Sequence, residues 1–360
     1  MNKNRITSIN KIDFKLYLYL FISFIFLITI GIRAVKGEIN FEFYADSETY
    51  IEFMNENQSF SDILLLYPNM LGPTLILKIL NQSFIGVFLF NIFIVLFFYF
   101  SSTKNNIMNK KYLFFYLLIS PMFFSSVLTI NKEIISILSI TLFFKYFKSK
   151  SYLMLILSLF FSILVRWQMS LFIICLTILL TKWNPFKKYR LYLVIFFLLT
   201  ISLIYYFNLS SFEKFNRIAE LGQETAVEGS GLFSNVLKVQ NSNILGYFLA
   251  FIPKFLFLFI GVLVRFYKLL DFTDFYNNVV VFTQCIANFI ILVNIIKLKI
   301  KLDNIYFFSA IVYCIIFSLS PIFAPRYLFP GYILFAMAIA SHKSNLSLKS
   351  AIKNNKENVL

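Results

Sequence analysis

The 360-residue sequence contains few of the residues on which most soluble enzymes depend. It has one histidine, His342, which argues against a histidine-based metal site and against a Ser-His catalytic triad. Its three cysteines, Cys175, Cys285 and Cys314, lie inside apolar runs without CxxC spacing, so we interpret them as small apolar residues. The sequence therefore predicts neither a metal centre nor a cofactor.

Charge is scarce as well, because 14% of the residues are charged against about 25% in soluble proteins. Hydrophobic residues make up 59% of the chain, and the mean hydropathy is +0.77. Long apolar runs separated by lysine clusters are typical of a polytopic helical membrane protein, whereas a transmembrane β-barrel would alternate over segments of about ten residues. We predict an all-α fold that forms a single transmembrane domain over residues 1–360.

The net charge of +16 does not predict a nucleic-acid partner, because no soluble domain with a basic face is visible. The lysines instead indicate membrane topology. The first apolar run has no small-residue cleavage site after it, so we expect a retained helix rather than a signal peptide. We predict about ten transmembrane spans, at residues 15–32, 82–101, 112–130, 134–147, 152–165, 169–181, 191–207, 277–296, 304–320 and 328–341.

Two further apolar segments do not fit as full spans. Residues 62–80 are interrupted by two prolines and a glycine, and residues 244–264 contain Pro253-Lys254 near their middle. Counting either one as a span would move the lysine clusters that follow it to the opposite side of the membrane. We predict that both are amphipathic or re-entrant segments on the outer face, where irregular backbone is tolerated against protein or water.

The lysine and arginine clusters predict the orientation of the chain. With both termini in the cytoplasm, 21 of the 33 basic residues fall on the inner side. This arrangement gives a first periplasmic loop with its amphipathic segment at 33–81 and a large periplasmic loop with its re-entrant segment at 208–276. Residues 343–360 form a cytoplasmic tail. The sequence shows no internal repeat, which argues against a symmetric transporter.

Charged residues nevertheless recur at the predicted outer turns. Any one of them could be solvated, could cap helix carbonyls or could extend to lipid headgroups. Because charges near a membrane bundle are costly, their gathering on one face favours a functional site. They are Lys132-Glu133, Arg166 and Arg326 at three short turns, Asp46 and Glu48 in the first outer loop, and Arg217 in the long one.

Cations beside carboxylates suit a transfer reaction from a sugar linked to a lipid diphosphate. The arginine fork binds two phosphate oxygens, and cations stabilise the charge that develops on the leaving group. A carboxylate can accept the proton of an acceptor hydroxyl. Aromatic residues that could bind sugar rings stand next to the charged positions, namely Tyr44, Tyr50, Trp167 and Tyr327.

The order of these features resembles that of bacterial O-antigen polymerases and related surface-polysaccharide polymerases. A retained first helix precedes an acidic and tyrosine-rich motif, and a large outer loop at 208–243 precedes a late RY-x-x-P motif. Each motif is short, but together they extend over nearly the whole chain. They are YADSETY (44–50), LYPNMLGPTL (66–75), NKEIISILSITLFFKYF (131–147), LVRWQ (164–168) and RYLFP (326–330).

The resemblance implies a multi-pass glycosyltransferase of the bacterial inner membrane. It would move a growing glycan from undecaprenyl diphosphate to the next lipid-linked repeat unit, in membrane lipid and alongside a flippase and a chain-length regulator. The catalytic candidates are Asp46 or Glu48 as the acceptor base, and Arg166 and Arg326 as diphosphate contacts. Lys132, and less strongly Arg217, would also contact the diphosphate. The substrate-binding candidates are Tyr50, Lys132, Glu133, Trp167, Gln168, Arg217 and Tyr327.

Other functions remain open on the sequence alone. Membrane glycosyltransferases of the GT-C type share the acidic first outer loop and use a lipid monophosphate sugar. Most have longer chains with a soluble C-terminal domain, whereas here 18 residues follow His342. The short tail favours the polymerase. The long outer loop argues against it, because this loop is poorer in arginine than that of some polymerases. A flippase of lipid-linked oligosaccharides and a structural scaffold are the alternatives from other classes.

Overall fold

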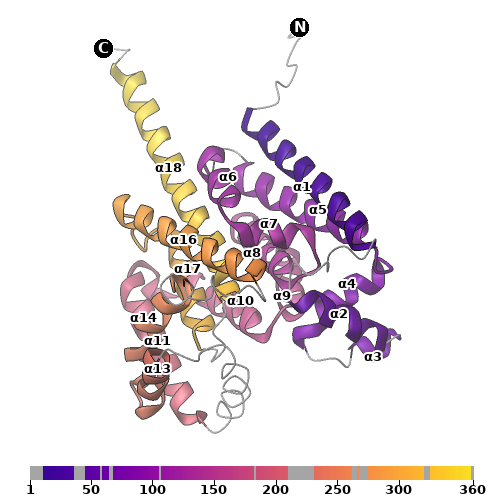
Figure 1. Ribbon diagram of the computed structural model, residues 1–360. Helices are drawn as coiled ribbons and strands as arrows, with labels where there is room; N and C mark the ends of the chain where they lie inside the picture. Colours follow the sequence, from indigo (N-terminus) through magenta and orange to yellow (C-terminus); the bar gives the residue numbers. More distant parts are fainter. Residues whose placement is uncertain are drawn as a thin grey trace. The chain divides into compact units, whose positions relative to one another are not determined.

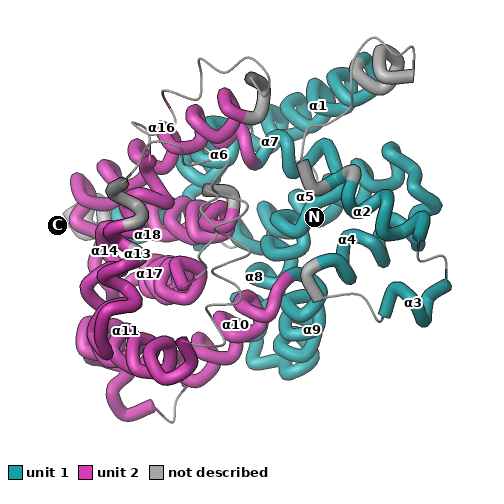
Figure 2. The backbone as a smooth tube through the Cα atoms, turned by 60° about the horizontal axis from the view of Figure 1, so that its bottom comes forward, with its two compact units in different colours: residues 1–119, 123–165, 343–360 teal, residues 120–122, 166–342 magenta. Residues whose placement is uncertain are grey.

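The computed structural model describes residues 11–35, 45–56, 59–64, 68–104, 107–181, 184–209, 231–261, 266, 275–319 and 325–357. These residues are mostly helical and contain no strand, which confirms the predicted all-α class (Figure 1). Internal contacts divide the chain into two compact units (Figure 2). Unit 1 comprises residues 1–119, 123–165 and 343–360, and unit 2 comprises residues 120–122 and 166–342.

The described helices of unit 1 are α1 (Lys11–Val35), α2 (Ala45–Glu56), α3 (Phe60–Leu64), α4 (Pro68–Ile79), α5 (Phe84–Thr103), α6 (Lys110–Leu118), α8 (Lys132–Ser149) and α9 (Tyr152–Ile163). Those of unit 2 are α10 (Trp167–Leu180), η2 (Pro185–Lys188), α11 (Arg190–Phe207), α13 (Gly231–Ser242), α14 (Gly246–Phe259), α16 (Phe275–Lys297), α17 (Ile305–Phe317) and η3 (Pro325–Leu328). Two helices belong to both units. The first two residues of α7 (Pro121–Leu128) are in unit 2 and the rest in unit 1, whereas α18 (Phe329–Glu357) begins in unit 2 and continues into unit 1 from residue 343.

Four of the described helices are long and apolar enough to cross a membrane. They are residues Lys11–Thr29 of α1, the whole of α5 and α11, and residues Asn278–Lys297 of α16. The bent pair α6 and α7 adds a fifth if it counts as one span. The helices α9, α10, α14 and α17 are apolar but have 12 to 14 residues, fewer than the roughly 20 of a straight crossing.

The predicted span over residues 112–130 is not one helix. It is broken after Ile119, and α6 and α7 meet at an angle of 79°. Pro121 explains the break, because proline has no backbone N–H and disfavours helical geometry in the residue before it. The Ser120 hydroxyl donates to Oε1 of Gln284 over 2.6 Å, and the Met122 backbone N–H donates to the same oxygen over 3.3 Å.

The predicted outer loops contain helices. The first loop contains α2, α3 and α4, of which α4 lies within the segment predicted as amphipathic or re-entrant, and the large loop contains α13. Helix α14, within the second such segment, continues through Pro253. Helix α18 continues to Glu357, beyond the end of the last predicted span at residue 341.

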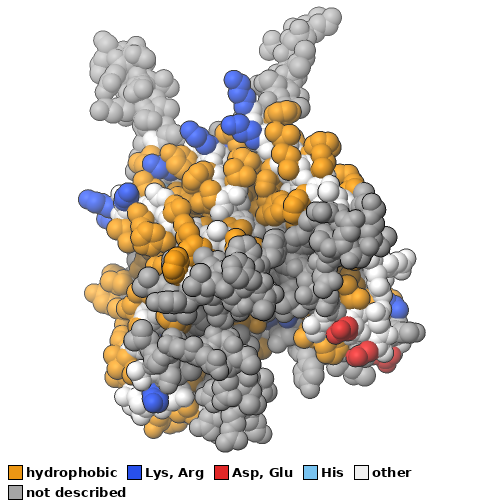
Figure 3. Space-filling view, viewed as in Figure 1, with side chains coloured by type: hydrophobic (Ala, Val, Ile, Leu, Met, Phe, Trp, Pro, Cys, Tyr) orange, Lys and Arg blue, Asp and Glu red, His pale blue; other side chains and the backbone are white. Residues whose placement is uncertain are grey.

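Large apolar side chains lie on the outside of the long helices. Examples are Phe14 and Phe21 on α1, Phe93 on α5 and Phe196 on α11, all exposed. Figure 3 shows such side chains in orange over much of the visible surface. Water-soluble proteins rarely expose apolar surface on this scale, so the surface is consistent with a lipid environment.

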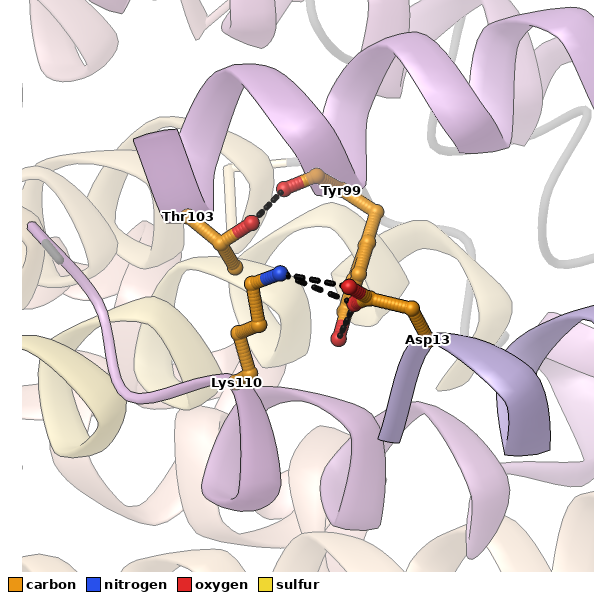
Figure 4. Close-up of polar contacts among 4 residues, drawn as sticks. All are labelled: Asp13, Tyr99, Thr103 and Lys110. Atoms are coloured by element: carbon orange, nitrogen blue, oxygen red, sulfur yellow. Dashed lines mark hydrogen bonds and ion pairs between the residues drawn. The ribbon is translucent and has the colours of Figure 1, made fainter. Parts of the chain in front are cut away.

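One end of unit 1 is held by an ion pair among α1, α5 and α6 (Figure 4). Lys110 Nζ donates to both carboxylate oxygens of Asp13, over 3.0 and 2.7 Å, and the Tyr99 hydroxyl donates to Asp13 over 3.3 Å. All three side chains are largely withdrawn from solvent. The contact joins the beginning of α1, the end of α5 and the beginning of α6, which we predicted on the same side of the membrane.

The opposite end of unit 1 carries acidic side chains. Glu52 and Glu56 of α2 and Asp62 of α3 are exposed, and Figure 3 shows acidic side chains over these helices. Helices α2 and α3 both pack against α4, and α4 also packs against α8. In α4, the Gly72 N–H donates to the Leu164 carbonyl over 3.1 Å, and a Cβ at Gly72 would lie 2.3 Å from that oxygen.

Candidate functional site

Lys132 and Glu133 begin helix α8, whose N-terminus is capped by Asn131. The Asn131 Oδ1 accepts a hydrogen bond from the Ile134 N–H over 2.9 Å, as an N-cap residue typically does. Its Nδ2 donates to the carbonyls of Ser126 and Thr129, each over 2.6 Å. One side chain therefore fixes both the end of α7 and the start of α8, and with them the position of the Lys132-Glu133 backbone.

Asn91 of α5 supports the same segment from the other side. It is buried, and its Nδ2 lies 3.3, 3.1 and 2.9 Å from the carbonyls of Ser126, Val127 and Thr129. The last carbonyls of a helix have no partner inside the helix, and in an apolar interior they need one. Asn91 supplies it, which explains why a polar residue occupies the middle of an apolar helix.

Helix α2 covers the start of α8. The Ser47 hydroxyl donates to the Ile130 carbonyl over 3.2 Å, and Tyr50 is buried with its ring 5.3 Å from the Lys132 ammonium. The side chains of Lys132 and Glu133 are only 7% and 5% exposed. The structure thus excludes the interpretation of this pair as a solvated turn, and it brings together three of the predicted residues, Tyr50, Lys132 and Glu133.

A cavity of about 160 Å³ lies beside this cluster. Ser47 and Ile51 of α2, Leu77 of α4, Val87 of α5 and Thr129 after α7 line it, with more apolar than polar surface. A dry apolar cavity of about this volume can hold a group of the size of benzene. The cavity is therefore able to take a small apolar group next to the buried charges of α8.

In unit 2, Arg166 occupies the N-cap position of α10. Its backbone is extended, and its carbonyl accepts hydrogen bonds from the N–H groups of Met169 and Ser170. The side chain is 7% exposed, and the guanidinium carbon lies 3.9 Å from the centre of the Tyr327 ring. Because a guanidinium is planar and weakly hydrated, it stacks well on an aromatic face. The structure brings these two predicted residues together.

Tyr327 is held by the helices around it. Its carbonyl accepts a hydrogen bond of 2.8 Å from the Tyr313 hydroxyl of α17. The Tyr313 ring stacks on Phe317 at 4.0 Å and meets Phe172 of α10 edge-on at 5.2 Å. Helices α10 and α17 therefore fix η3, and the stacked Arg166 has a defined position.

The neighbours of Arg166 differ in exposure. Trp167 is exposed and so is available to a sugar or to lipid. Gln168 has a buried Oε1 that receives no hydrogen bond in the described part of the chain. A buried acceptor of this kind can take a hydrogen bond from a ligand hydroxyl.

Four predicted residues have side chains outside the described residues. The backbones of Asp46 and Glu48 belong to α2, and that of Arg326 belongs to η3. Arg217 lies outside the described residues altogether. The backbone alone places Asp46 and Glu48 on the helix that contributes Tyr50, and Arg326 next to Tyr327.

The sequence analysis missed Lys254 as a site residue. It lies in α14 and is 0% exposed, and its Nζ donates to Oε1 of Gln240 in α13 over 2.8 Å. Helix α14 also packs against η3, the element that carries Tyr327. A lysine inside an apolar run, directly after Pro253, was the available signal, and we used it only as evidence against a span.

Comparisons with known proteins add no relative. No protein-family model matches the chain, and no curated protein or solved structure gives a significant match. Among the described residues, no group of three or more His, Cys, Asp or Glu side chains could hold a metal ion. Over the residues that the structure describes, the fold is all-helical and has four or five helices able to cross a membrane. The function must be argued from the chain's own residues.

Proposed function

We propose that this protein is a polymerase of lipid-linked polysaccharide repeat units. It transfers the growing glycan from undecaprenyl diphosphate to the next repeat unit on the outer face of a bacterial inner membrane. The observation that carries the proposal is the buried Arg166 guanidinium stacked on Tyr327. A buried cation at a helix start, backed by an aromatic ring, is suited to an anionic group such as a diphosphate.

The chemistry follows from these groups. When the glycosidic bond breaks, negative charge grows on the leaving diphosphate, and a cation fixed in a dry site stabilises it. Stacking on Tyr327 holds the guanidinium plane, which reduces the ordering needed to bind two oxygens. In the proposal, Asp46 or Glu48 removes the proton of the acceptor hydroxyl, and Arg326 and Arg217 add contacts to the diphosphate.

The proposal includes the topology inferred from the sequence. Ten spans and two outer segments place both termini in the cytoplasm, and the site faces the periplasm. Unit 1 supports this arrangement. The Asp13–Lys110 pair contacts the end of α5 through Tyr99, whereas Lys132, which contacts Tyr50, follows the segment that Asn91 in the first half of α5 binds. In the same pathway, a flippase would deliver the repeat units and a chain-length regulator would limit the polymer.

The second candidate is a GT-C type transferase that adds one sugar from a polyprenyl phosphate. The observation that favours it is the buried Glu133 beside Lys132, because a carboxylate near the edge of the membrane could act as the general base. A lipid-linked oligosaccharide flippase is the third candidate. It is disfavoured because the sequence shows no pair of related halves.

The surface glycan of a clean deletion strain, with the gene restored as control, distinguishes these functions. The polymerase proposal predicts that a single repeat unit remains on the lipid core while the ladder of longer chains is lost. A ladder of unchanged length with a lighter repeat unit would identify a sugar-adding transferase instead. Loss of every repeat unit from the surface would identify a transport step.

A further inference from the structure

Lys254 presents an unusual charge balance inside unit 2. Its ammonium is completely enclosed, and the hydrogen bond that it makes in the described structure goes to a neutral amide oxygen, that of Gln240. Within the described residues of unit 2, Asp303 is the sole acidic residue, and it is exposed between α16 and α17. Isolated buried charges are costly, so an anionic ligand would stabilise the Lys254 ammonium.

Gln240, the hydrogen-bond partner of Lys254, has a second polar atom that can bind a ligand. Gln240 is buried, and its Nε2 donor makes no hydrogen bond in the described part of the chain. An ammonium has three protons, of which the bond to Gln240 uses one. The ammonium and the amide therefore offer N–H donors from two neighbouring side chains, which is the donor set that binds an oxyanion.

The α13–α14 hairpin keeps this pair in position. The turn between the helices is fixed to α11, because the Ser202 hydroxyl donates to the Ile244 carbonyl over 2.6 Å and the Tyr205 hydroxyl donates to Asn241 over 2.8 Å. A Cβ at Gly246 would lie 2.4 Å from the Gln240 carbonyl, so the two helices approach each other as closely as glycine allows. The main packing partner of α13 is α14.

We infer that Lys254 and Gln240 form an oxyanion-binding site for the diphosphate group of a lipid-linked substrate. This inference rests on the proposed function for the identity of the ligand, and on the geometry for the site itself. Helix α14 packs on η3, so the site lies on a helix adjoining the element that positions Tyr327 under Arg166. The bond between Lys254 and Gln240 holds the ammonium until a phosphate oxygen replaces it.

The test uses the full chain in lipid nanodiscs and measures the thermal unfolding midpoint. Inorganic pyrophosphate and undecaprenyl diphosphate are the two probes, and undecaprenol is the neutral control lipid. We expect the midpoint of the wild type to rise by about 3–5 °C at a saturating probe. A rise with both probes means that any diphosphate binds, and a rise with the lipid alone means that the headgroup must arrive on its carrier.

Lys254→Met is the decisive variant, and Lys238→Met, on the exposed face of α13, is its matched control. Without probe, Lys254→Met should unfold at the wild-type temperature or above, because an apolar chain of similar length replaces a buried charge. With probe, its midpoint should not rise, whereas that of Lys238→Met should rise fully. Gln240→Leu should lose at least half of the rise in unfolding midpoint that the probe causes. If Lys254→Met does not fold, Gln240→Leu serves as the test of the site in its place.

A wild type that neither probe stabilises would overturn the site, and so would a Lys254→Met variant that keeps the full rise. The readout requires no glycan transfer, so it is separate from the test of the proposed function. If the deletion strain keeps its ladder while Lys254 binds diphosphate, the polymerase proposal fails and the anion site stands. If the ladder is lost but Lys254→Met binds normally, the site fails and the polymerase proposal stands.

Discussion

At the scale of single residues, buried polar side chains decide where the charges of the candidate site lie. The sequence identified Lys132 and Arg166 as unusual because cations at outer turns contradict the positive-inside rule, and Glu133 lies next to Lys132. It could not show that they are buried, since their burial depends on tertiary contacts such as the docking of α2 and the position of Tyr327. Asn91 and Lys254 were missed because a polar residue in an apolar run has no visible partner in sequence.

Asn91 gives a prediction at this scale. Asn91→Leu keeps the volume of the side chain but removes the donor to three buried carbonyls. We expect a loss of about 1–3 kcal/mol of stability, because Asn131 still donates to the Ser126 and Thr129 carbonyls and the Val127 carbonyl alone loses its side-chain donor. The thermal midpoint of the purified protein in nanodiscs measures this loss. Asn294→Leu, at an amide that bonds within its own helix, is the control, and equal midpoints for both variants would refute the role of Asn91.

At the scale of elements, the length of the apolar runs predicted the long helices whose sequence alone is apolar enough to cross a membrane. The spans 82–101, 191–207 and 277–296 agree with α5, α11 and α16 to within a few residues. The helical state of α2 was not predicted, because it depends on packing, and α4 lies in a segment predicted only as amphipathic or re-entrant. Helix α4 contains Pro73 and depends on the close approach of Gly72 to Leu164, which no local pattern shows. The break between α6 and α7 was not predicted, because Pro121 lies inside a continuous apolar run that was read as one span.

The Asp13–Lys110 pair gives the prediction for elements. Asp13→Asn removes the charge that Lys110 meets at 2.7 Å and should lower the stability by about 1–2 kcal/mol, because the pair is partly buried. Lys110→Met should have a similar effect, and the double variant should be no worse than either single variant. Thermal unfolding of the four proteins measures the coupling. Additive losses would mean that the pair does not hold α1 to α6.

At the scale of the whole molecule, composition predicted the class and charge bias predicted the orientation. Both are properties of the chain summed over many residues, so a wrong helix boundary does not change them. The division of the chain into two units depends on contacts between residues distant in sequence, about which composition contains no information.

The predicted orientation can be checked by labelling. In a background without Cys175, Cys285 and Cys314, single cysteines replace exposed residues at the two predicted sides. A membrane-impermeant maleimide added to intact cells should label Glu56→Cys and Asp62→Cys. Lys111→Cys and Lys299→Cys should react only after the membrane is opened. The reverse pattern would place the Arg166 site in the cytoplasm and would exclude a periplasmic polymerase.

The most direct test of the central claim is the length of the surface glycan in the deletion strain restored with Arg166 variants. At wild-type protein levels, Arg166→Ala should reduce polymer by about 100-fold or more, because it removes the cation that stabilises the leaving diphosphate. Arg166→Lys should recover only part of it, since a lysine cannot stack on Tyr327 or offer two parallel donors. Lys188→Ala, at an exposed lysine, should leave the ladder unchanged. A full-length ladder from Arg166→Ala would contradict the account.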